Sequence, residues 1–491
     1  MDPHVASESL AYANLSELDA ALSEGSLTSV TLLQTLLDRI AAIDAVGTTV
    51  ELRSVLAVAA DALEQAQQCD DERARGELRG PLHGIPLLIK DNIEARGLPC
   101  TAGSLALIDS PVPIDAPVVA RLRGAGAIIM GSTNLSEWAN MRSPMSTSGW
   151  SAVGGLVANP WALDRSAGGS SSGSGAALAA GLAPLALGTE TDGSIVCPSA
   201  LNGVVGLKPT VGSLPVDRIV PISHSQDTPG PMARCVDDVR ALWEILSGAS
   251  VSPIDAASLR VAAVPTWNSG LDHVDTQFAD VVERLRGADV FAAVGEAVVP
   301  AMGDAEGLDE YTVLLAELHD DLARYLVRRQ PASGVRNLID VITLNQAQAA
   351  SELVHFGQEH FDRAVARGGV DEAALDARQR GLHWAREEGL DPALAEWDVL
   401  LAPAYVPAWK HDFVLGHPRI GGGVTSPAAI AGYPVLSLPM GLVGGLPVGL
   451  ALVARPGAES VLLAAAAAVE ALLALNAEGG WRPGFRQPSR G

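Results

Sequence analysis

The stretch from residue 168 to residue 210, GGSSSGSGAALAAGLAPLALGTETDGSIVCPSALNGVVGLKPT, decides the fold class of this chain and raises the question of its chemistry. It opens as a glycine- and serine-rich run and continues as an apolar segment, which predicts a short buried helix followed by a strand. Two serines stand where a nucleophile could stand. Ser171 lies in a G-x-S-x-G pattern, and Ser194 follows Asp192 and Gly193. A serine hydroxyl is a weak nucleophile, so either one needs a base close by.

Ser171 lacks the setting that a Ser-His-Asp hydrolase needs. In that class the G-x-S-x-G elbow follows directly on a hydrophobic strand, whereas residues 158–168 read ANPWALDRSAG and are polar and turn-like. The ten histidines are scattered, and His83 in PLHGIP is a lone histidine of the kind that is more often structural. The glycine- and serine-rich run also lacks the G-K-[ST] ending of a phosphate-binding loop. Both kinds of site are therefore disfavoured.

The lysines separate the alternatives better than the histidines do. The chain holds 33 lysines and arginines, and the lysines among them are Lys90, Lys208 and Lys410. Lys90 follows the apolar run 85–89, which predicts a buried strand that ends there. A desolvated lysine can lose its proton and act as a base, whereas arginine stays protonated. The other interpretation is a structural cation paired with Asp91 or a backbone carbonyl, and the residues alone leave the two open.

Short apolar strands alternate with helical stretches over the first half of the chain. We predict helices over 27–44 (with Thr28 or Ser29 as the cap), 54–68 and 116–124, and strands over 85–89, 127–130 and 184–188. Strands that alternate with helices predict an α/β sheet whose polar strand ends carry the site.

The rest of the chain becomes helix-rich after about residue 240 and then returns to short strands. We predict amphipathic helices over 311–329 and 343–367, short strands within 398–408 and 431–454, and a core-packed helix over 461–475. We expect one large domain over 1–491, with a mixed β-sheet core in 60–240 covered by helices. A helix-rich elaboration over 241–400 would line a substrate pocket, whose walls we place within 300–440.

Charge and composition exclude several classes of partner. A net charge of −24 is unsuited to a nucleic-acid partner, since binding needs a basic face to displace counterions. The four cysteines form no C-x-x-C pair, and the first residues carry neither a basic region nor an apolar run. The apolar stretch 461–475 is too short to span a bilayer comfortably. We therefore expect a cytoplasmic protein without a membrane or nucleic-acid partner.

The stretch 168–210 resembles the defining signature of the amidase signature family of serine hydrolases. GPLHGIPLLIKDNI (80–93) is similar to that family's lysine segment, and GSTNLSEWA, NPW, QDTPGPMAR and AGYPVLSLPMG match its other landmarks in order. The resemblance implies a Ser-Ser-Lys triad with Ser194 as nucleophile, Ser170 as bridging serine and Lys90 as base. It also implies a cis peptide bond between Gly169 and Ser170, and it leaves Ser171 outside the triad.

The same resemblance implies an oxyanion hole made by backbone N–H groups of Thr191, Asp192 and Gly193. The family commonly has a second glycine where this chain has Asp192, whose carboxylate would repel an oxyanion if it pointed inward. TETDGSIVCP, TNLSEWAN and SQDTPGPMAR resemble the peptide amidases of the family. Trp138 and Asn140 align with a segment that lines the substrate site. They could equally be packing residues, and Ser171 could add a hydrogen bond.

The activity implied by this resemblance is hydrolysis of carboxamides with release of ammonia, through an acyl-enzyme and without cofactor or metal. The substrate class it favours is the C-terminal amide of peptides. Alternatives are a general aliphatic or aryl amidase, a glutaminase component of a tRNA amidotransferase, and a silent binding protein on an amidase scaffold. We expect a small-molecule or peptide amide substrate and a monomer or homodimer.

Overall fold

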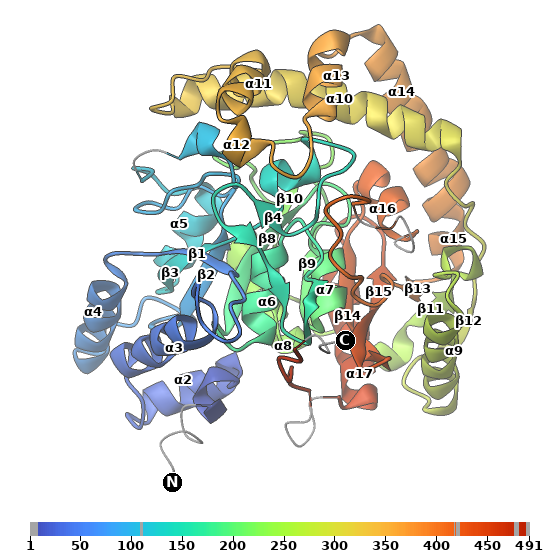
Figure 1. Ribbon diagram of the computed structural model, residues 1–491. Coiled ribbons are helices and arrows are strands. Elements are labelled where there is room, and N and C mark those ends of the chain that lie inside the picture. Colours follow the sequence, from blue (N-terminus) through green and yellow to red (C-terminus); the bar gives the residue numbers. More distant parts are fainter. Residues whose placement is uncertain (1–7, 109–110, 417, 419–422, 476–480, 488–491) are drawn as a thin grey trace.

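The computed structural model describes residues 8–108, 111–416, 418, 423–475 and 481–487 (Figure 1). One eleven-stranded sheet forms the centre of this part of the chain, in the order β1-β3-β2-β8-β10-β9-β14-β15-β13-β11-β12. In that order the strands are β1 (Val55–Val58), β3 (Ile128–Thr133), β2 (Pro86–Lys90), β8 (Leu185–Glu190), β10 (Thr228–Ala233), β9 (Val205–Lys208), β14 (Val435–Val443), β15 (Leu446–Val453), β13 (Val399–Pro403), β11 (Arg260–Ala263) and β12 (Ala293–Glu296).

The sheet is mixed, as expected for this fold class. β2 runs parallel to both β3 and β8, whereas β10 runs antiparallel to β8 and β9. Every residue of β2, β3 and β8 is buried, which agrees with their short, continuous apolar runs. The predicted strands at 85–89, 127–130 and 184–188 are confirmed, because each begins within one residue and ends within three residues of the observed bounds.

Helices before, between and after the strands pack against the sheet or against one another. They are α2 (Leu15–Ser23), α3 (Ser29–Ile43), α4 (Ala62–Ala74), α5 (Pro117–Gly124), α6 (Ser172–Ala179), α7 (Val196–Asn202), α8 (Val236–Ser247), α9 (Asp272–Gly287), α16 (Thr425–Ala431) and α17 (Glu459–Leu473). The predicted cap of α3 is confirmed, since the Thr28 hydroxyl accepts a hydrogen bond from the Thr31 amide at 3.1 Å. α17 packs on β14, as predicted for an apolar helix of the core. No helix in the described ranges is both long and apolar enough to cross a bilayer.

A layer of helices lies above the sheet in the view of Figure 1. It comprises α10 (Asp304–Arg329), α11 (Leu338–Ala347), α12 (Ala349–Glu352), α13 (Glu359–Arg367) and α14 (Glu372–Leu382). A π-helical turn (His383–Leu390) and α15 (Asp391–Glu396) lead back to β13. Smaller elements are the pairs β4 (Trp150–Ser151) with β5 (Gly155–Leu156) and β6 (Ala158–Asn159) with β7 (Ala162–Ser166), and four 3-10 turns at 105–107, 137–140, 256–258 and 265–267.

The sheet draws strands from outside residues 60–240. β1 precedes that segment, and β11 and β12 lie within the part of the chain that we expected to be a helix-rich elaboration. β9 pairs with β14, so residues 205–208 join the first half of the sheet to the strands near the C-terminus. The core therefore extends well beyond 60–240.

The helix predicted over 54–68 is wrong in its first part. Residues 55–58 form β1, which pairs antiparallel with β3 at the edge of the sheet, and the helix begins only at Ala62. Hydrogen bonds to β3 satisfy the backbone of this segment, and they outweigh the helical preference of its alanines.

The single helix predicted over 343–367 is also wrong, because the chain forms α11, α12 and α13 with a break at 353–358. Phe356 lies in this break and is buried against Trp150, with ring centroids 5.1 Å apart. A straight helix would carry this ring away from the body of the protein, so burial of the aromatic side chain determines the break.

Candidate active site

The predicted base lies at the end of a central strand. Lys90 is the last residue of β2, and its neighbour β8 runs parallel and ends at Glu190. The carboxyl ends of parallel strands meet at one edge of a sheet, which brings Lys90 beside Thr189. Ser170 reaches the same place from the loop that precedes α6.

Lys90 is fully buried and contacts three polar atoms. Its Nζ lies 2.7 Å from Ser170 Oγ, 2.8 Å from Thr189 Oγ1 and 3.2 Å from the Thr189 carbonyl oxygen. Asn92 Nδ2 also donates a hydrogen bond to Thr189 Oγ1, at 2.9 Å. A neutral amine has two N–H groups and one lone pair, which suits two bonds to Thr189 and one accepted from the Ser170 hydroxyl.

The surroundings favour the neutral form of this amine. Burial lowers the pKa of Lys90 from 10.5 to about 7, and the carboxylates of Glu190 and Asp227 oppose the shift without cancelling it. A large fraction of the amine is therefore unprotonated near neutral pH, as a general base requires. The arrangement can pass a proton from Ser170 to Lys90.

Ser170 and Ser194 are brought into one neighbourhood by backbone contacts. The peptide bond between Gly169 and Ser170 is cis. The amide of the next residue, Ser171, donates a hydrogen bond to the Ser194 carbonyl oxygen at 3.1 Å. Ser194 itself lies in the turn between β8 and α7. The Glu190 carboxylate accepts hydrogen bonds from the two amides that follow Ser194, at 2.6 and 2.9 Å, and so fixes this turn.

The segment proposed for the oxyanion hole is held from two sides. The Thr191 hydroxyl donates a hydrogen bond to Asp227 Oδ1 at 2.6 Å. Asp192 Oδ2 accepts one from Ser426 Oγ at 2.6 Å, so the carboxylate that replaces the usual glycine is turned toward α16. Gly193 has φ of 76°, and a Cβ there would overlap the Tyr405 hydroxyl. This position therefore requires glycine both for its backbone conformation and for space.

The three residues suggested for substrate contacts have structural partners. Trp138 is buried and packs edge-to-face on Phe361, with ring centroids 5.7 Å apart. Asn140 donates a hydrogen bond to Ser148 Oγ at 3.1 Å. Ser171 Oγ donates to the Thr189 carbonyl oxygen at 3.1 Å and accepts from the Thr189 amide at 3.2 Å. None of these three residues is among the described residues that line the cavity beside Ser170.

That cavity measures about 250 Å³ and opens beside the Lys90–Ser170 pair. Part of its wall is formed by Asn92, Ala139, Ser170, Thr189 and Thr191. The rest comes from residues 216–222, His224, Asp227 and Thr228 and from Asp321, Arg324, Tyr325 and Arg328 of α10. The helix-rich segment thus contributes to the wall through α10, while the loop before β10 supplies much of the remainder.

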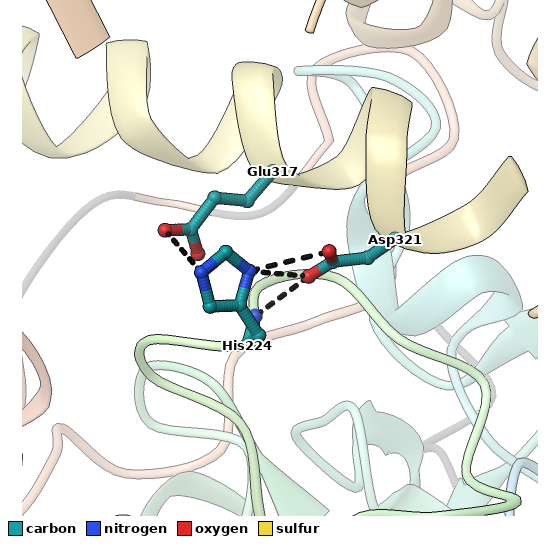
Figure 2. Close-up of side chains that lie close together, drawn as sticks. All are labelled: His224, Glu317 and Asp321. Atoms are coloured by element: carbon teal, nitrogen blue, oxygen red, sulfur yellow. Dashed lines mark hydrogen bonds and ion pairs between the residues drawn. The ribbon is translucent and has the colours of Figure 1, made fainter. Parts of the chain in front are cut away.

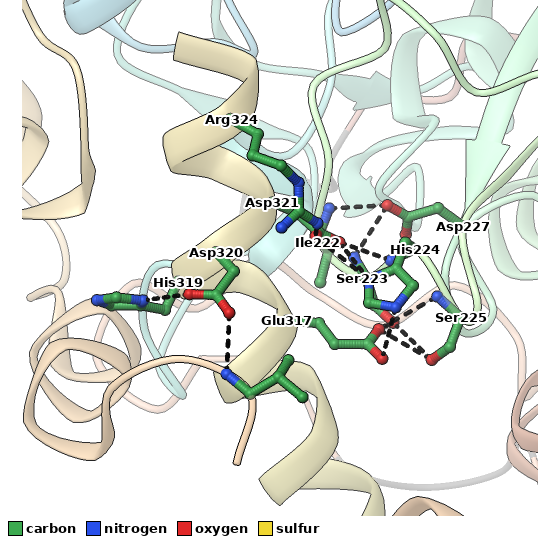
Figure 3. A network of polar contacts seen from close by, with 11 residues as sticks. Ile222, Ser223, His224, Ser225, Asp227, Glu317, His319, Asp320, Asp321 and Arg324 are labelled. Carbon is green, nitrogen blue, oxygen red and sulfur yellow. Dashed lines mark hydrogen bonds and ion pairs between the residues drawn. The ribbon is translucent and has the colours of Figure 1, made fainter. Parts of the chain in front are cut away.

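His224 lies between two carboxylates of α10 at the rim of this cavity (Figure 2). Its Nδ1 is 2.9 Å from Asp321 Oδ2, its Nε2 is 3.4 Å from Glu317 Oε1, and the three candidate ligand atoms lie within 4.8 Å of one another. Such a trio could ligate a metal ion, but Glu317 Oε2 and both oxygens of Asp321 already accept hydrogen bonds from Ser223, His224, Ser225 or Arg324, and Glu317 Oε1 faces His224 Nε2. The trio is therefore better described as a polar network that fixes the loop (Figure 3).

Sequence reasoning missed the side chains that surround the predicted triad. The Thr189 hydroxyl oxygen accepts hydrogen bonds from both Lys90 and Asn92. Glu190 and Asp227 hold the turn that carries Ser194. The only signal of these missed side chains in the sequence is position, since three of them follow or end apolar strands and Asp227 lies in QDTPGPMAR. Burial raises the pKa of Asp227 to about 6.

Comparison with known proteins identifies the family of the chain. The family model described as Amidase matches residues 31–463. A crystal structure of the peptide amidase PAM with the competitive inhibitor chymostatin is 42% identical with a TM-score of 0.87, over 94% of this chain and 97% of that chain. The native peptide amidase from Stenotrophomonas maltophilia is 41% identical with a TM-score of 0.87, over 94% and 96%.

A second group of relatives is named for a different function. A glutamyl-tRNA(Gln) amidotransferase component from Symbiobacterium thermophilum is 35% identical over 93% of this chain and 97% of its own length. Both groups match nearly the whole chain, and the family model spans its sheet from α3 to α17. The chain therefore belongs to the amidase signature family, as an enzyme of the amidase type.

Proposed function

We propose that this enzyme hydrolyses C-terminal carboxamides of peptides and releases ammonia, with Ser194, Ser170 and Lys90 as its catalytic residues. The observation that carries the proposal is the buried contact of 2.7 Å between Lys90 Nζ and Ser170 Oγ. A lysine whose pKa lies near 7 can act as a base at the pH of most cells. Ser170 then connects this base to the nucleophile.

The first half of the proposed reaction forms an acyl-enzyme. Ser194 Oγ attacks the amide carbonyl carbon, its proton passes to Ser170, and the Ser170 proton passes to Lys90 Nζ. The negative charge on the carbonyl oxygen faces the backbone amides of 191–194. The C–N bond then breaks, and the proton returns through Ser170 to the leaving nitrogen, which departs as ammonia. In the second half, water attacks the ester by the same relay and restores Ser194.

The substrate class rests on similarity and on the cavity. The solved structures at 41–42% identity are of peptide amidases. The cavity of about 250 Å³ offers an apolar wall that includes Val216, Ile219, Val220 and Ile222. An apolar wall in the cavity that Ser170 lines suits the side chain of an amino-acid amide, whose burial is favourable.

Ammonia release separates the candidate substrates. We expect the purified protein to release ammonia faster from an amidated dipeptide than from a simple aliphatic amide, and to cleave an anilide more slowly. Internal peptide bonds should remain intact by mass spectrometry. A preference for the aliphatic amide or the anilide would keep the serine chemistry and discard the peptide-amide assignment.

A glutaminase function is the second candidate, because of the amidotransferase components among the relatives. In that case free glutamine would be hydrolysed, and the rate would rise when a partner protein is bound. The net charge of −24 disfavours a role close to tRNA. Glutamine beside the dipeptide amide in the same assay decides between the two.

A silent scaffold would not acylate its serine. We therefore expect a serine-directed fluorophosphonate to label Ser194 in the native protein, with the Ser194→Ala variant as the control. Peptide mapping of the labelled protein would identify the modified residue. Absence of label would contradict the proposed nucleophile.

A further inference from the structure

Asp227 connects the segment of the nucleophile to the wall of the cavity. It lies directly before β10, whose first residue Thr228 pairs with Glu190 at the end of β8. Its Oδ1 accepts a hydrogen bond from the Thr191 hydroxyl at 2.6 Å. Its Oδ2 accepts from the backbone amides of Ile222 and Ser223, at 2.8 and 3.0 Å. One half-buried carboxylate thus holds two separate pieces of the chain.

The loop on the far side of Asp227 is itself fixed to α10 (Figure 3). Glu317 Oε2 accepts hydrogen bonds from the hydroxyls of Ser223 and Ser225 and from the Ser225 amide. Asp321 Oδ2 accepts from the backbone amide of His224 at 2.8 Å. Contacts therefore run without a gap from α10 through residues 223–225 and Asp227 to Thr191.

These contacts matter because an oxyanion hole works only when its donors are already aimed at the developing charge. A displacement of about 1 Å can cost a large part of the rate, even where no reacting group has been removed. Thr191 opens the segment whose amides would receive the oxyanion, and the loop around Ile222 forms wall that would contact the acyl group. Both are attached to the same carboxylate, so their spacing is fixed.

We propose that Asp227 is a positioning residue that sets the Thr191 end of the oxyanion segment against the cavity wall. This inference rests on the proposed amide hydrolysis at Ser194. It predicts that loss of the link lowers kcat for a bound substrate more than it raises KM. The effect is on the alignment of the bound amide, since Asp227 does not itself contact the reacting atoms in this scheme.

Two near-isosteric variants remove the hydrogen bond between Thr191 and Asp227, one from each partner. We expect Thr191→Val and Asp227→Leu each to lower kcat for an amidated dipeptide by about 10- to 100-fold, with KM changed less than kcat. The double variant should be no slower than Asp227→Leu alone, because the hydrogen bond that Thr191→Val removes is already lost when Asp227 is replaced. Asp227→Asn should recover much of the rate. Its amide oxygen can accept from the loop amides while its NH₂ donates to Thr191.

Asp44 provides a matched control. It is a buried aspartate that accepts hydrogen bonds from the amides of Ser54 and Val55 and from the Ser54 hydroxyl, and it does not line the cavity. Asp44→Leu should lower stability and leave kcat per folded molecule unchanged. Assays at about pH 8 keep Asp227 ionised, because its pKa lies near 6.

Labelling of Ser194 separates this inference from the proposed substrate. The rate of fluorophosphonate labelling should fall in Thr191→Val and Asp227→Leu and stay constant in Asp44→Leu. A wild type that is labelled but releases no ammonia refutes the substrate, while the labelling rates still decide the role of Asp227. Additive effects in the double variant, or equal effects of Asp44→Leu and Asp227→Leu, would overturn the inference. A wild type with neither labelling nor turnover would overturn both.

Discussion

Lys90 is a lysine in a chain that otherwise uses arginine for nearly all its cations. Its surroundings explain the choice. The side chain is fully buried at the end of β2 and meets only neutral oxygen atoms at hydrogen-bond distance, from Ser170 and Thr189. An arginine there would keep its charge and could not serve as a base. The residue type alone leaves a base and a structural cation open, and the sequence does not reveal the contacts with Thr189.

The pH dependence of acylation follows from this site. The pKa of Lys90 is lowered to about 7, so the amine is protonated and inactive below that pH and becomes a base above it. We expect the single-turnover acylation rate to rise through about pH 7 and then level off. Lys90→Met should lower the rate by about a thousandfold or more. Stopped-flow assays from about pH 5 to about pH 9 would measure both effects.

The control for this prediction is Lys410→Met, which removes an exposed lysine that pairs with Asp164 at 3.7 Å. Its rate and pH profile should match the wild type. A limb near the ordinary lysine pKa of about 10.4 would refute the assignment of the base. So would an unchanged profile in Lys90→Met.

A substitution at Gly193 tests whether the close packing of the Ser194 turn against Tyr405 is needed for activity. An alanine there would need φ of 76° and would overlap the Tyr405 hydroxyl, so the turn has to shift. We expect Gly193→Ala to lower kcat by about 100-fold or more, since the oxyanion donors move with the turn. Gly212→Ala is the matched control, because Gly212 has φ of 84° and open space around it.

Gly212→Ala should cost a little stability and leave kcat unchanged. Comparable rates for the two variants would mean that the space beside Tyr405 does not limit activity. Crystal structures of both variants would show whether the turn at 191–194 has moved.

The helices above the sheet are attached to it by a buried ion cluster. Arg142 Nε lies 3.0 Å from Glu137 Oε1, and its guanidinium also donates to the Glu352 carbonyl oxygen at the end of α12. Its Cζ lies 4.2 Å from the centre of the Phe356 ring. Arg142, Glu137 and Glu352 are all buried. The cluster joins the loop after β3 to the helical layer that shapes the cavity.

Breaking this cluster should be costly. Arg142→Met would leave Glu137 and Glu352 without their cation, and burial already raises the pKa of the Glu137 carboxyl. Removing one partner of a buried ion pair costs about 3–5 kcal/mol of unfolding free energy. Urea denaturation would measure it. Arg75→Met removes an exposed arginine that pairs with Glu77, so its effect should be much smaller. Equal losses would show that the cluster adds nothing beyond surface pairs.

Secondary structure could be predicted where a segment's own pattern decides it. The cap at Thr28 and the strands that end at Lys90 and Glu190 carry strong local signals, and they agree with the structure. β1 and the break at 353–358 depend instead on a distant partner, β3 in one case and Trp150 in the other. A pattern within the segment cannot reveal such a partner.

The whole molecule is one sheet whose strand order the sequence does not reveal. The α/β class and the mixed sheet are confirmed, whereas the pairing of β9 with β14 joins residues far apart in the chain. The cavity is also formed by segments that lie far apart in the chain, because its walls come from the ends of central strands, the loop before β10 and α10. Lys90 and Ser170 could be identified from sequence motifs. The contacts of Asp227 with Thr191 and with the loop at Ile222 form only when these segments pack together.

The segment that carries Ser194 is enclosed by groups from much later in the chain, Tyr405 and Ser426. β14, which pairs with β9 beside this segment, comes later still. On the ribosome, Lys90, Ser170 and Ser194 therefore emerge well before the residues that close over them. A nascent chain that ends before Tyr405 therefore carries the Ser194 segment without the groups that enclose it in the folded protein.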